Sequence, residues 1–287
     1  MEKADIQEKF SQFLREFYYN ELVTTVSEGR KSINVDFSVL EKFDSELADY
    51  TLENPEEIFQ IAEESFKQID LPSDLKLRIR FFNLPEMREI RIRNLRAEHI
   101  GKLIVVDGMV RRASEVRPEV SEAIFQCPNC GQKMTVIQTG TALNAPMQCD
   151  RCDNNKSFKL VDQKLFDARW LAIEEPFEIT SGERPSEIKI FLKEDLTSPK
   201  MRNKTDPGNR IKVTGVLKQL PRRIKGTMSR QLEIYIDSNY LHTVEIEWEE
   251  VDINNTDVKR ILELASDPQI YDNSLRRLSR QFSDIKT

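Results

Sequence analysis

The sequence predicts an α+β fold: an N-terminal helical bundle, then a small β sandwich or barrel, then a short helical tail. Apolar residues recur at helical spacing over the first 70 residues, and the period changes to two from Leu75 onward. All four cysteines lie in one segment that interrupts the strands, and a basic segment separates two later strands. The length of 287 residues indicates two or three domains.

The helical part begins with apolar residues on one helix face. These residues are Ile6, Phe10, Phe13, Leu14 and Phe17. We expect Asp5 to cap this helix, a short strand at 32–37, and a second helical stretch over 39–47. Asn54 and Pro55 open a further helix that continues to Ile69. We interpret the aromatic residues as core packing and not as a surface for a cofactor or partner.

The β part begins where Leu77, Ile79 and Phe81 alternate with basic residues. Further strands are expected at 103–110, 122–126, 188–192, 210–217 and 232–236. Because the strands are short and few helices separate them, an antiparallel sandwich or small barrel is favoured over a doubly wound α/β sheet.

The cysteines form two pairs with two residues between the members of each pair. The pairs are Cys127 with Cys130 and Cys149 with Cys152, separated by eighteen residues. This spacing suits a zinc ribbon with four thiolate ligands, and Gly131 supports the first turn. The alternatives are two disulfides or a redox dithiol. Nothing marks the chain for secretion, and a redox site needs only one pair. Four thiolates leave no open position, so we predict structural and not catalytic zinc.

A basic segment at 200–231 has a net charge of +9, whereas the whole chain has −6 and residues 1–70 have −10. Strand-like runs at 211–217 and 232–236 flank its second half, with Gly226 in a turn position. We predict that this hairpin contacts nucleic acid phosphates through Lys218, Arg222, Arg223, Lys225 and Arg230. A second basic set, on alternating strand positions, is Arg111, Arg112 and Arg117. The alternative is a charged loop tip that only aids solubility.

Several functional classes are disfavoured. The sequence has no GxxxxGK[ST] loop, no HExxH, no GxSxG and only two histidines, so we expect no enzyme activity and no ATP binding. No apolar run reaches the roughly 18 residues of a membrane span, and no signal peptide is evident, which predicts an intracellular protein. An aromatic stacking platform for single strands is not evident either, which favours contact with the backbone.

Five segments together resemble the N-terminal part of the archaeal mini-chromosome maintenance (MCM) replicative helicase. They are His99–Val110, Cys127–Cys130, Leu192–Leu196, Pro207–Gly215 and Ala265–Tyr271. The resemblance covers nearly all of residues 1–266. It implies a helical subdomain at 1–74, an OB-fold at 75–126 and 153–245, a zinc ribbon at 127–152, and at 246–287 a linker and the start of a missing or truncated ATPase module.

The resemblance also implies roles for particular residues. The hairpin would line the central channel of a ring, and Arg112 and Arg117 would hold single-stranded DNA across the OB-fold. The loop that signals to the ATPase tier would comprise Thr180, Ser181, Gly182, Glu183, Arg184, Pro185, Ser186 and Glu187.

The function predicted from these observations is a DNA-binding, ring-forming region of a replicative helicase. We expect it to encircle single- and double-stranded DNA as a homohexamer, and two hexamers to join through their zinc ribbons. Its location would be cytoplasmic and nucleoid-associated. The alternative is a stand-alone zinc-ribbon/OB adaptor in transcription or translation.

Overall fold

The computed structural model describes residues 3–66, 69, 77–138, 143–155, 157–180, 184–224, 227–244, 260 and 265. Residues 1–244 form one compact unit and residues 245–287 a second. The short helical tail and the linker expected at 246–287 lie almost wholly outside the described residues. Within the described part, no helix is long and apolar enough to cross a membrane.

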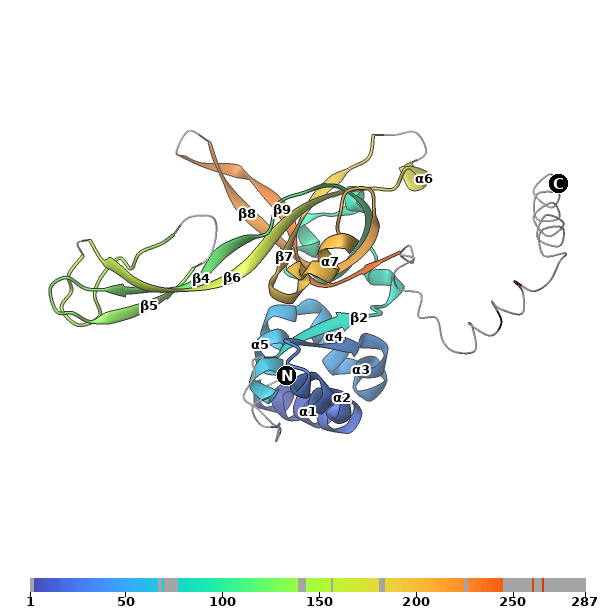
Figure 1. The fold of residues 1–287 in the computed structure, drawn as a ribbon, viewed down its shortest axis with the longest axis horizontal. Helices are drawn as coiled ribbons and strands as arrows, with labels where there is room; N and C mark the ends of the chain where they lie inside the picture. The colour runs from blue at the N-terminus through green and yellow to red at the C-terminus, as the bar shows by residue number, and fades with distance from the viewer. Residues whose placement is uncertain are drawn as a thin grey trace. The chain divides into compact units, whose positions relative to one another are not determined.

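Five helices make up most of the N-terminal part (Figure 1). They are α1 (Lys3–Phe17), α2 (Tyr19–Ser27), α3 (Phe37–Phe43), α4 (Ser45–Glu53) and α5 (Pro55–Phe66). We call these helices, together with strands β1 and β2 described below, the helical module. Pro55 opens α5 as expected. Asp5 lies inside the first turn of α1, so its predicted capping role was wrong.

The helical stretch expected over 39–47 is two helices separated at Asp44. The Asp36 carboxylate accepts a hydrogen bond from the Ser38 backbone N–H (2.9 Å), and the Asp44 carboxylate accepts one from Leu47 (3.0 Å). Each aspartate therefore caps a new helix, because its side chain satisfies an N–H that the first turn leaves without a partner. The periodicity of the apolar residues continues across the break and hides it.

The core of the helical module is rich in aromatic side chains. Phe10, Phe13 and Phe81 are completely buried, and Phe13 packs with its ring centroid 5.9 Å from that of Phe10. Phe17 is the exception in the predicted stripe, because 48% of it is exposed. The interpretation of the stripe as core is confirmed for its other members.

Strand β1 (Ser32–Asp36) pairs in parallel with β2 (Arg78–Phe82). We expected the strand at 77–81 to begin the sandwich or barrel, and this was wrong. Leu77, Ile79 and Phe81 are buried in the core of the helical module instead. Alternation shows that a strand buries one face, but it does not show which core receives that face.

The second core lies inside a closed barrel. Its strands are β3 (Leu103–Ala113), β6 (Lys159–Glu174), β7 (Glu187–Lys193), β8 (Arg210–Ile224) and β9 (Thr227–Thr243). They follow the order β3-β8-β9-β7-β6, and a further pairing of β3 with β6 closes the ring. All pairs are antiparallel except β7 with β9, which is parallel. Buried side chains inside the barrel include Val106, Ile173 and Ile190.

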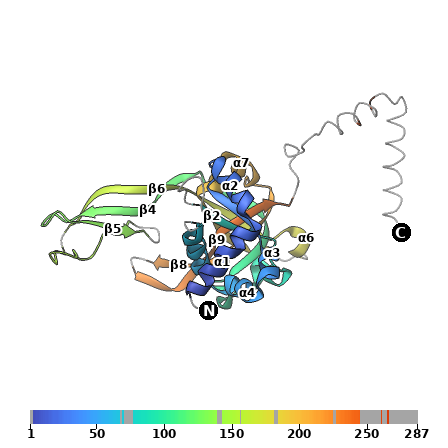
Figure 2. The same cartoon turned by 90° about the horizontal axis from the view of Figure 1, so that it is seen from below.

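Two ribbons extend from the barrel (Figures 1 and 2). One is the hairpin of β8 and β9. The other joins the outer half of β6 to β4 (Arg117–Gln126), which pairs in turn with β5 (Lys133–Ile137). We call this second ribbon, with the four cysteines at its end, the cysteine ribbon. Neither β5 nor β6 was predicted.

Short helices fill the connections. They are η1 (Glu86–Arg88), η2 (Ile92–Asn94), η3 (Ala97–His99), α6 (Phe177–Thr180), η4 (Glu194–Thr197) and α7 (Pro199–Lys204).

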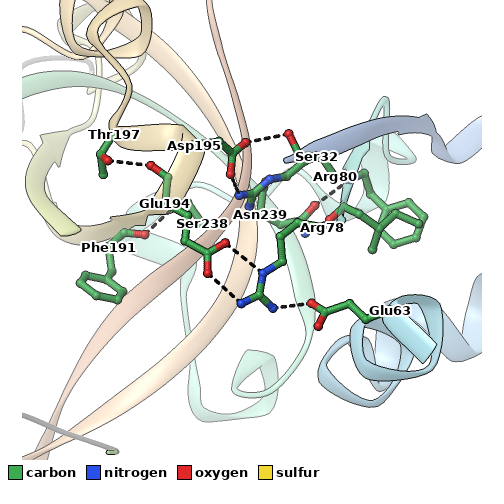
Figure 3. A network of polar contacts seen from close by, with 12 residues as sticks. Ser32, Glu63, Arg78, Arg80, Phe191, Glu194, Asp195, Thr197, Ser238 and Asn239 are labelled. Atoms are coloured by element: carbon green, nitrogen blue, oxygen red, sulfur yellow. Dashed lines mark hydrogen bonds and ion pairs between the residues drawn. The ribbon is translucent and has the colours of Figure 1, made fainter. Parts of the chain in front are cut away.

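A polar network ties the helical module to the barrel (Figure 3). Arg78 donates hydrogen bonds to both carboxylate oxygens of Glu194 (2.9 and 2.8 Å) and also pairs with Glu63. Arg80 is buried; it pairs with Asp195 and donates to the carbonyl oxygen of Asn239 (2.8 Å). Such charge-assisted, partly two-pronged bonds fix orientation as well as distance.

Candidate metal centre and nucleic-acid interface

The four cysteines lie together at the end of the cysteine ribbon. Their sulfur atoms are all within 4.8 Å of one another. The Sγ atoms of Cys127 and Cys152 are 3.6 Å apart, and those of Cys130 and Cys149 are 3.5 Å apart. This clustering of both pairs is the arrangement that a single tetrahedral metal ion needs.

Each cysteine pair is held by the same kind of turn. The backbone N–H of Gly131 donates to the carbonyl oxygen of Cys127 (3.0 Å), and that of Asp153 donates to Cys149 (3.1 Å). Both donors have positive φ angles, 71° at Gly131 and 55° at Asp153. The sequence indicated the role of Gly131 but not that of Asp153, because aspartate adopts this conformation far less often than glycine.

The thiols of this cluster have unequal proton affinities. Burial acts to raise the pKa of Cys127, but hydrogen bonds from the backbone N–H groups of Cys130 and Asn129 outweigh it and lower the pKa to about 6. At Cys130 the backbone N–H of Gln132 acts to lower the pKa, but burial and the other three sulfurs outweigh it and raise the pKa to about 12. Four thiolates this close therefore need a cation to share their charge.

The cysteine ribbon has almost no apolar core of its own. Its buried cluster consists of Cys127, Met134 and Cys149, with Phe158 packed against it. The donor set of four sulfurs fits a structural zinc ion, and the small core means that a bound metal would supply most of the folding energy of this region.

The basic hairpin continues well beyond the barrel. Strand β8 pairs with β3 as far as Val216 but with β9 as far as Ile224, which lies opposite Thr227. The strands are thus longer than the sequence indicated. Lys225 and Gly226 lie outside the described residues, so the expected turn stays a prediction.

The structure describes only some atoms of the hairpin residues that were predicted to contact phosphate. The backbone of Arg222 and Arg223 belongs to β8, and their side chains are outside the description. Arg230 on β9 is exposed, and the structure gives it no ion pair with another described residue.

Lys218 lies at the root of the hairpin and is already paired. Its ammonium group lies 2.8 Å from the carboxylate of Asp237 and also contacts Glu56 of the helical module. Burial acts to lower the pKa of Lys218, but these two carboxylates outweigh it and raise the pKa. The structure therefore places Lys218 in the junction with the helical module, and its contact with phosphate stays a prediction.

The second basic set is divided between two strands. Arg111 and Arg112 are consecutive on β3, next to a bulge, and both contact Glu187 at 3.2 and 2.6 Å. Arg117 is exposed at the start of β4. The three do not occupy alternating positions of one strand as expected, but Arg112 and Arg117 each pair with an alanine of β6, at Ala172 and Ala168.

The loop expected at 180–187 begins as α6 ends. Residues 181–183 lie outside the described residues, and Arg184 is exposed. The backbone N–H of Glu175 donates to the carbonyl oxygen of Ser186 (3.1 Å), which anchors the end of the loop beside β6. Glu187, which pairs with Arg111 and Arg112, begins β7.

The helical module and the closed barrel are those of a known class of replication protein. Residues 7–93 match the family model of the MCM N-terminal domain, and residues 91–221 match that of the MCM OB domain. The chain belongs to the minichromosome maintenance (MCM) family and corresponds to its N-terminal region.

Individual relatives agree with this placement. The "Minichromosome maintenance protein MCM" of Saccharolobus solfataricus is 28% identical over 96% of this chain and 43% of its own length. The "DNA replication licensing factor mcm4" of Xenopus tropicalis is 26% identical over 90% of this chain and 32% of its own length. The chain thus spans less than half the length of these relatives.

A solved structure has the same fold. The crystal structure of the N-terminal domain of an archaeal MCM superposes with a TM-score of 0.68 at 26% identity. The match covers 85% of this chain and 100% of that domain.

Proposed function

We propose that this chain is the DNA-binding, ring-forming N-terminal region of a replicative helicase, which encircles and grips single- and double-stranded DNA. The observation that carries the proposal is the β8–β9 hairpin, whose paired strands carry a basic segment beyond the barrel. Membership of the MCM family supports it. No observation favours the alternative, an adaptor in transcription or translation.

The hairpin suits contact with the sugar-phosphate backbone. The backbone of Arg222 and Arg223 belongs to β8, and that of Arg230 to β9, within the paired ribbon. We infer that these arginines and Lys225 contact phosphates. Asp206 is the only acid in residues 200–231, and it is engaged by Arg169 at 3.2 Å. On the hairpin itself, Glu233 lies opposite Leu220 and is paired with Lys189 at 2.8 Å. These two acids are therefore neutralised by neighbouring cations. Contacts of this kind are independent of base sequence and weaken with salt.

The remaining parts of the proposal concern the barrel and the metal. Arg111, Arg112 and Arg117 would hold single-stranded DNA against the barrel. Cys127, Cys130, Cys149 and Cys152 would bind a structural Zn²⁺, which supplies folding energy to the cysteine ribbon. Six chains would form the ring, and two rings would join through these ribbons.

We place the boundary between the two domains near residue 90 and not at 75. Strand β2 packs into the helical module, and the match to the MCM OB domain begins at residue 91. The loop at 180–187 would transmit signals to an ATPase tier. ATP hydrolysis would lie in that tier, because residues 1–287 contain no Walker loop. A cytoplasmic, nucleoid-associated location follows from the proposed role.

The test is the salt dependence of DNA binding. The triple substitution Arg222→Ala, Arg223→Ala, Lys225→Ala should weaken binding of single- and double-stranded DNA alike. The slope of log K against log salt concentration should fall by about two to three units, since three phosphate contacts are removed.

A matched control removes three exposed lysines outside the basic segment, Lys31, Lys42 and Lys133, with the same change in net charge. This variant should leave the slope nearly unchanged. Equal slopes for the hairpin variant and the parent protein would remove the hairpin from the mechanism.

A further inference from the structure

Four aromatic side chains gather on the outer face of the barrel. Trp170 on β6, Phe191 on β7 and Tyr235 on β9 have ring centroids 4.6 to 6.5 Å apart, and Phe166 lies 6.4 Å from Phe191. We call these four residues the aromatic cluster. Their neighbours in sequence, such as Leu171, belong to the barrel core, so the alternation of the strands directs the cluster outward. All four rings are only partly buried.

The cluster lies where the two ribbons leave the barrel. Strand β6 pairs with β7 from Ala168 onward and with β4 before that residue. Strand β9 pairs with β7 only at Tyr235–Asp237 and then continues along the hairpin with β8. A strand of DNA held by the hairpin would therefore pass close to these rings.

Two exposed arginines lie beside the cluster on the same face. Arg112 lies opposite Ala172, and Arg117 lies opposite Ala168, the residues two positions on either side of Trp170 in β6. Residues opposite one another, and residues two apart on a strand, share a face. Both arginines lie on the β3 and β4 side of β6, whereas Phe191 and Tyr235 lie on its β7 side, so the two cations line one edge of the aromatic cluster. Arg112 also pairs with Glu187 at 2.6 Å, and a phosphate would have to compete with this carboxylate.

Most of the remaining charges on this face neutralise one another. Lys189 pairs with Glu233, and Lys193 pairs with Asp237, each at 2.8 Å. Glu119, opposite Phe166, is an acid for which the structure gives no ion pair to a described residue. The centre of the face therefore has little net attraction for phosphate. The surface that it offers to a ligand consists of the faces and edges of the aromatic rings.

We propose that the aromatic cluster stacks the bases of single-stranded DNA, while Arg112 and Arg117 hold the backbone along its edge on β3 and β4. The proposal rests on the proposed DNA-binding function and adds to it a preference of this site for single-stranded over double-stranded DNA. Unpaired bases expose faces that can stack on aromatic rings, whereas the bases of a duplex are already stacked on each other. The cluster escapes sequence analysis because its members come from three strands.

The test uses the fluorescence of Trp170. The chain has two tryptophans, Trp170 and Trp248, so Trp248→Phe leaves Trp170 as the only one. In this background we expect oligothymidine to quench the fluorescence. An abasic oligonucleotide with the same number of phosphates, and a duplex, should bind with little quenching.

Substitution within the cluster should act on bases and not on phosphates. Trp170→Ala should weaken oligothymidine binding by roughly 10- to 100-fold, as expected for the loss of one stacked base. Binding of the abasic chain should change less than twofold, and Trp170→Phe should restore most of the affinity. If Trp170→Ala fails to fold by circular dichroism, Tyr235→Leu provides the second variant.

The outcomes separate this proposal from the function on which it rests. If the parent protein binds no DNA at all, both the stacking proposal and the proposed DNA-binding function are wrong. Equal affinity for oligothymidine and the abasic chain, with both reduced by the hairpin substitutions, would overturn stacking and leave the hairpin mechanism intact. A fall in mass by light scattering on Trp170→Ala, with oligothymidine affinity unchanged, would identify the cluster as a contact between chains and would also overturn stacking.

Discussion

The helical module and the cysteine ribbon bury very different amounts of apolar surface. The core of the module includes the fully buried rings of Phe10, Phe13, Phe37 and Phe81. The cluster at the end of the ribbon contains only Met134 and the partly buried Phe158 besides the cysteines themselves. Because apolar burial is the main favourable term in folding, the module can be stable by itself and the ribbon needs a metal ion.

The junction between the helical module and the barrel also differs from the two ribbons that project from the barrel. The junction of module and barrel is held by defined ion pairs such as Arg78 with Glu194. The cysteine ribbon and the hairpin instead extend away from the barrel. Beyond the barrel, the strands of each ribbon pair only with strands of the same ribbon. The first kind of region stabilises the chain, and the second presents side chains to partners.

The largest effect that tests this comparison is expected at the metal site. Cys149→Ser should abolish stoichiometric zinc binding and remove on the order of 10 kcal/mol of metal-dependent folding energy from the cysteine ribbon. Elemental analysis should show the loss of metal, and hydrogen exchange should show lost protection in β5. The helical module should keep its protection.

The control for this prediction lies in the other core. Phe81→Ala should lower the free energy of unfolding of the helical module by about 3–5 kcal/mol, because it leaves a cavity at a fully buried position. Its zinc content should stay at one ion per chain. Stoichiometric zinc in the Cys149→Ser protein would contradict the assignment of the ligands.

A smaller effect is expected at the junction in acid. Burial acts to raise the pKa of Glu194, but its hydrogen bonds to Arg78 and the positive charge of that residue outweigh this and lower the pKa. A lowered carboxyl pKa gives stability that is present above the unfolded value of about 4.3 and is lost as pH falls through the folded value.

Glu194→Gln should therefore cost about 1 kcal/mol of unfolding free energy at pH 7, and less as the pH approaches 3. Urea unfolding at several pH values measures both. The same substitution at the exposed Glu16 should have little effect at any pH. A constant difference between the Glu194 variant and the parent from pH 7 to pH 3 would show that the ion pair contributes nothing to the junction.

The sequence predicted those features that depend on local pattern. Pro55 and the acids after it mark the start of α5, and the two CxxC pairs predict the cysteine cluster, because each signal lies within a few residues. The closed barrel was predicted only as a class of fold. Its longest missed strand, β6, has an exposed outer half with no buried face to produce alternation.

Features that depend on pairing between distant segments were not predicted. The assignment of β2 to the helical module depends on its partner β1, more than 40 residues earlier. Lys218 is part of a basic run in the sequence, yet in the fold its ammonium group forms ion pairs with Asp237 and Glu56. The aromatic cluster requires the register of β6, β7 and β9, which no single segment contains.

The most direct test of the account is the mass of the protein by light scattering with and without DNA. A ring-forming region that grips DNA predicts an assembly of about six times the 33.5 kDa chain mass, which binds DNA as a unit. The hairpin triple variant should keep this mass and bind DNA more weakly. A mass of one chain at every concentration, with or without DNA, would contradict the account.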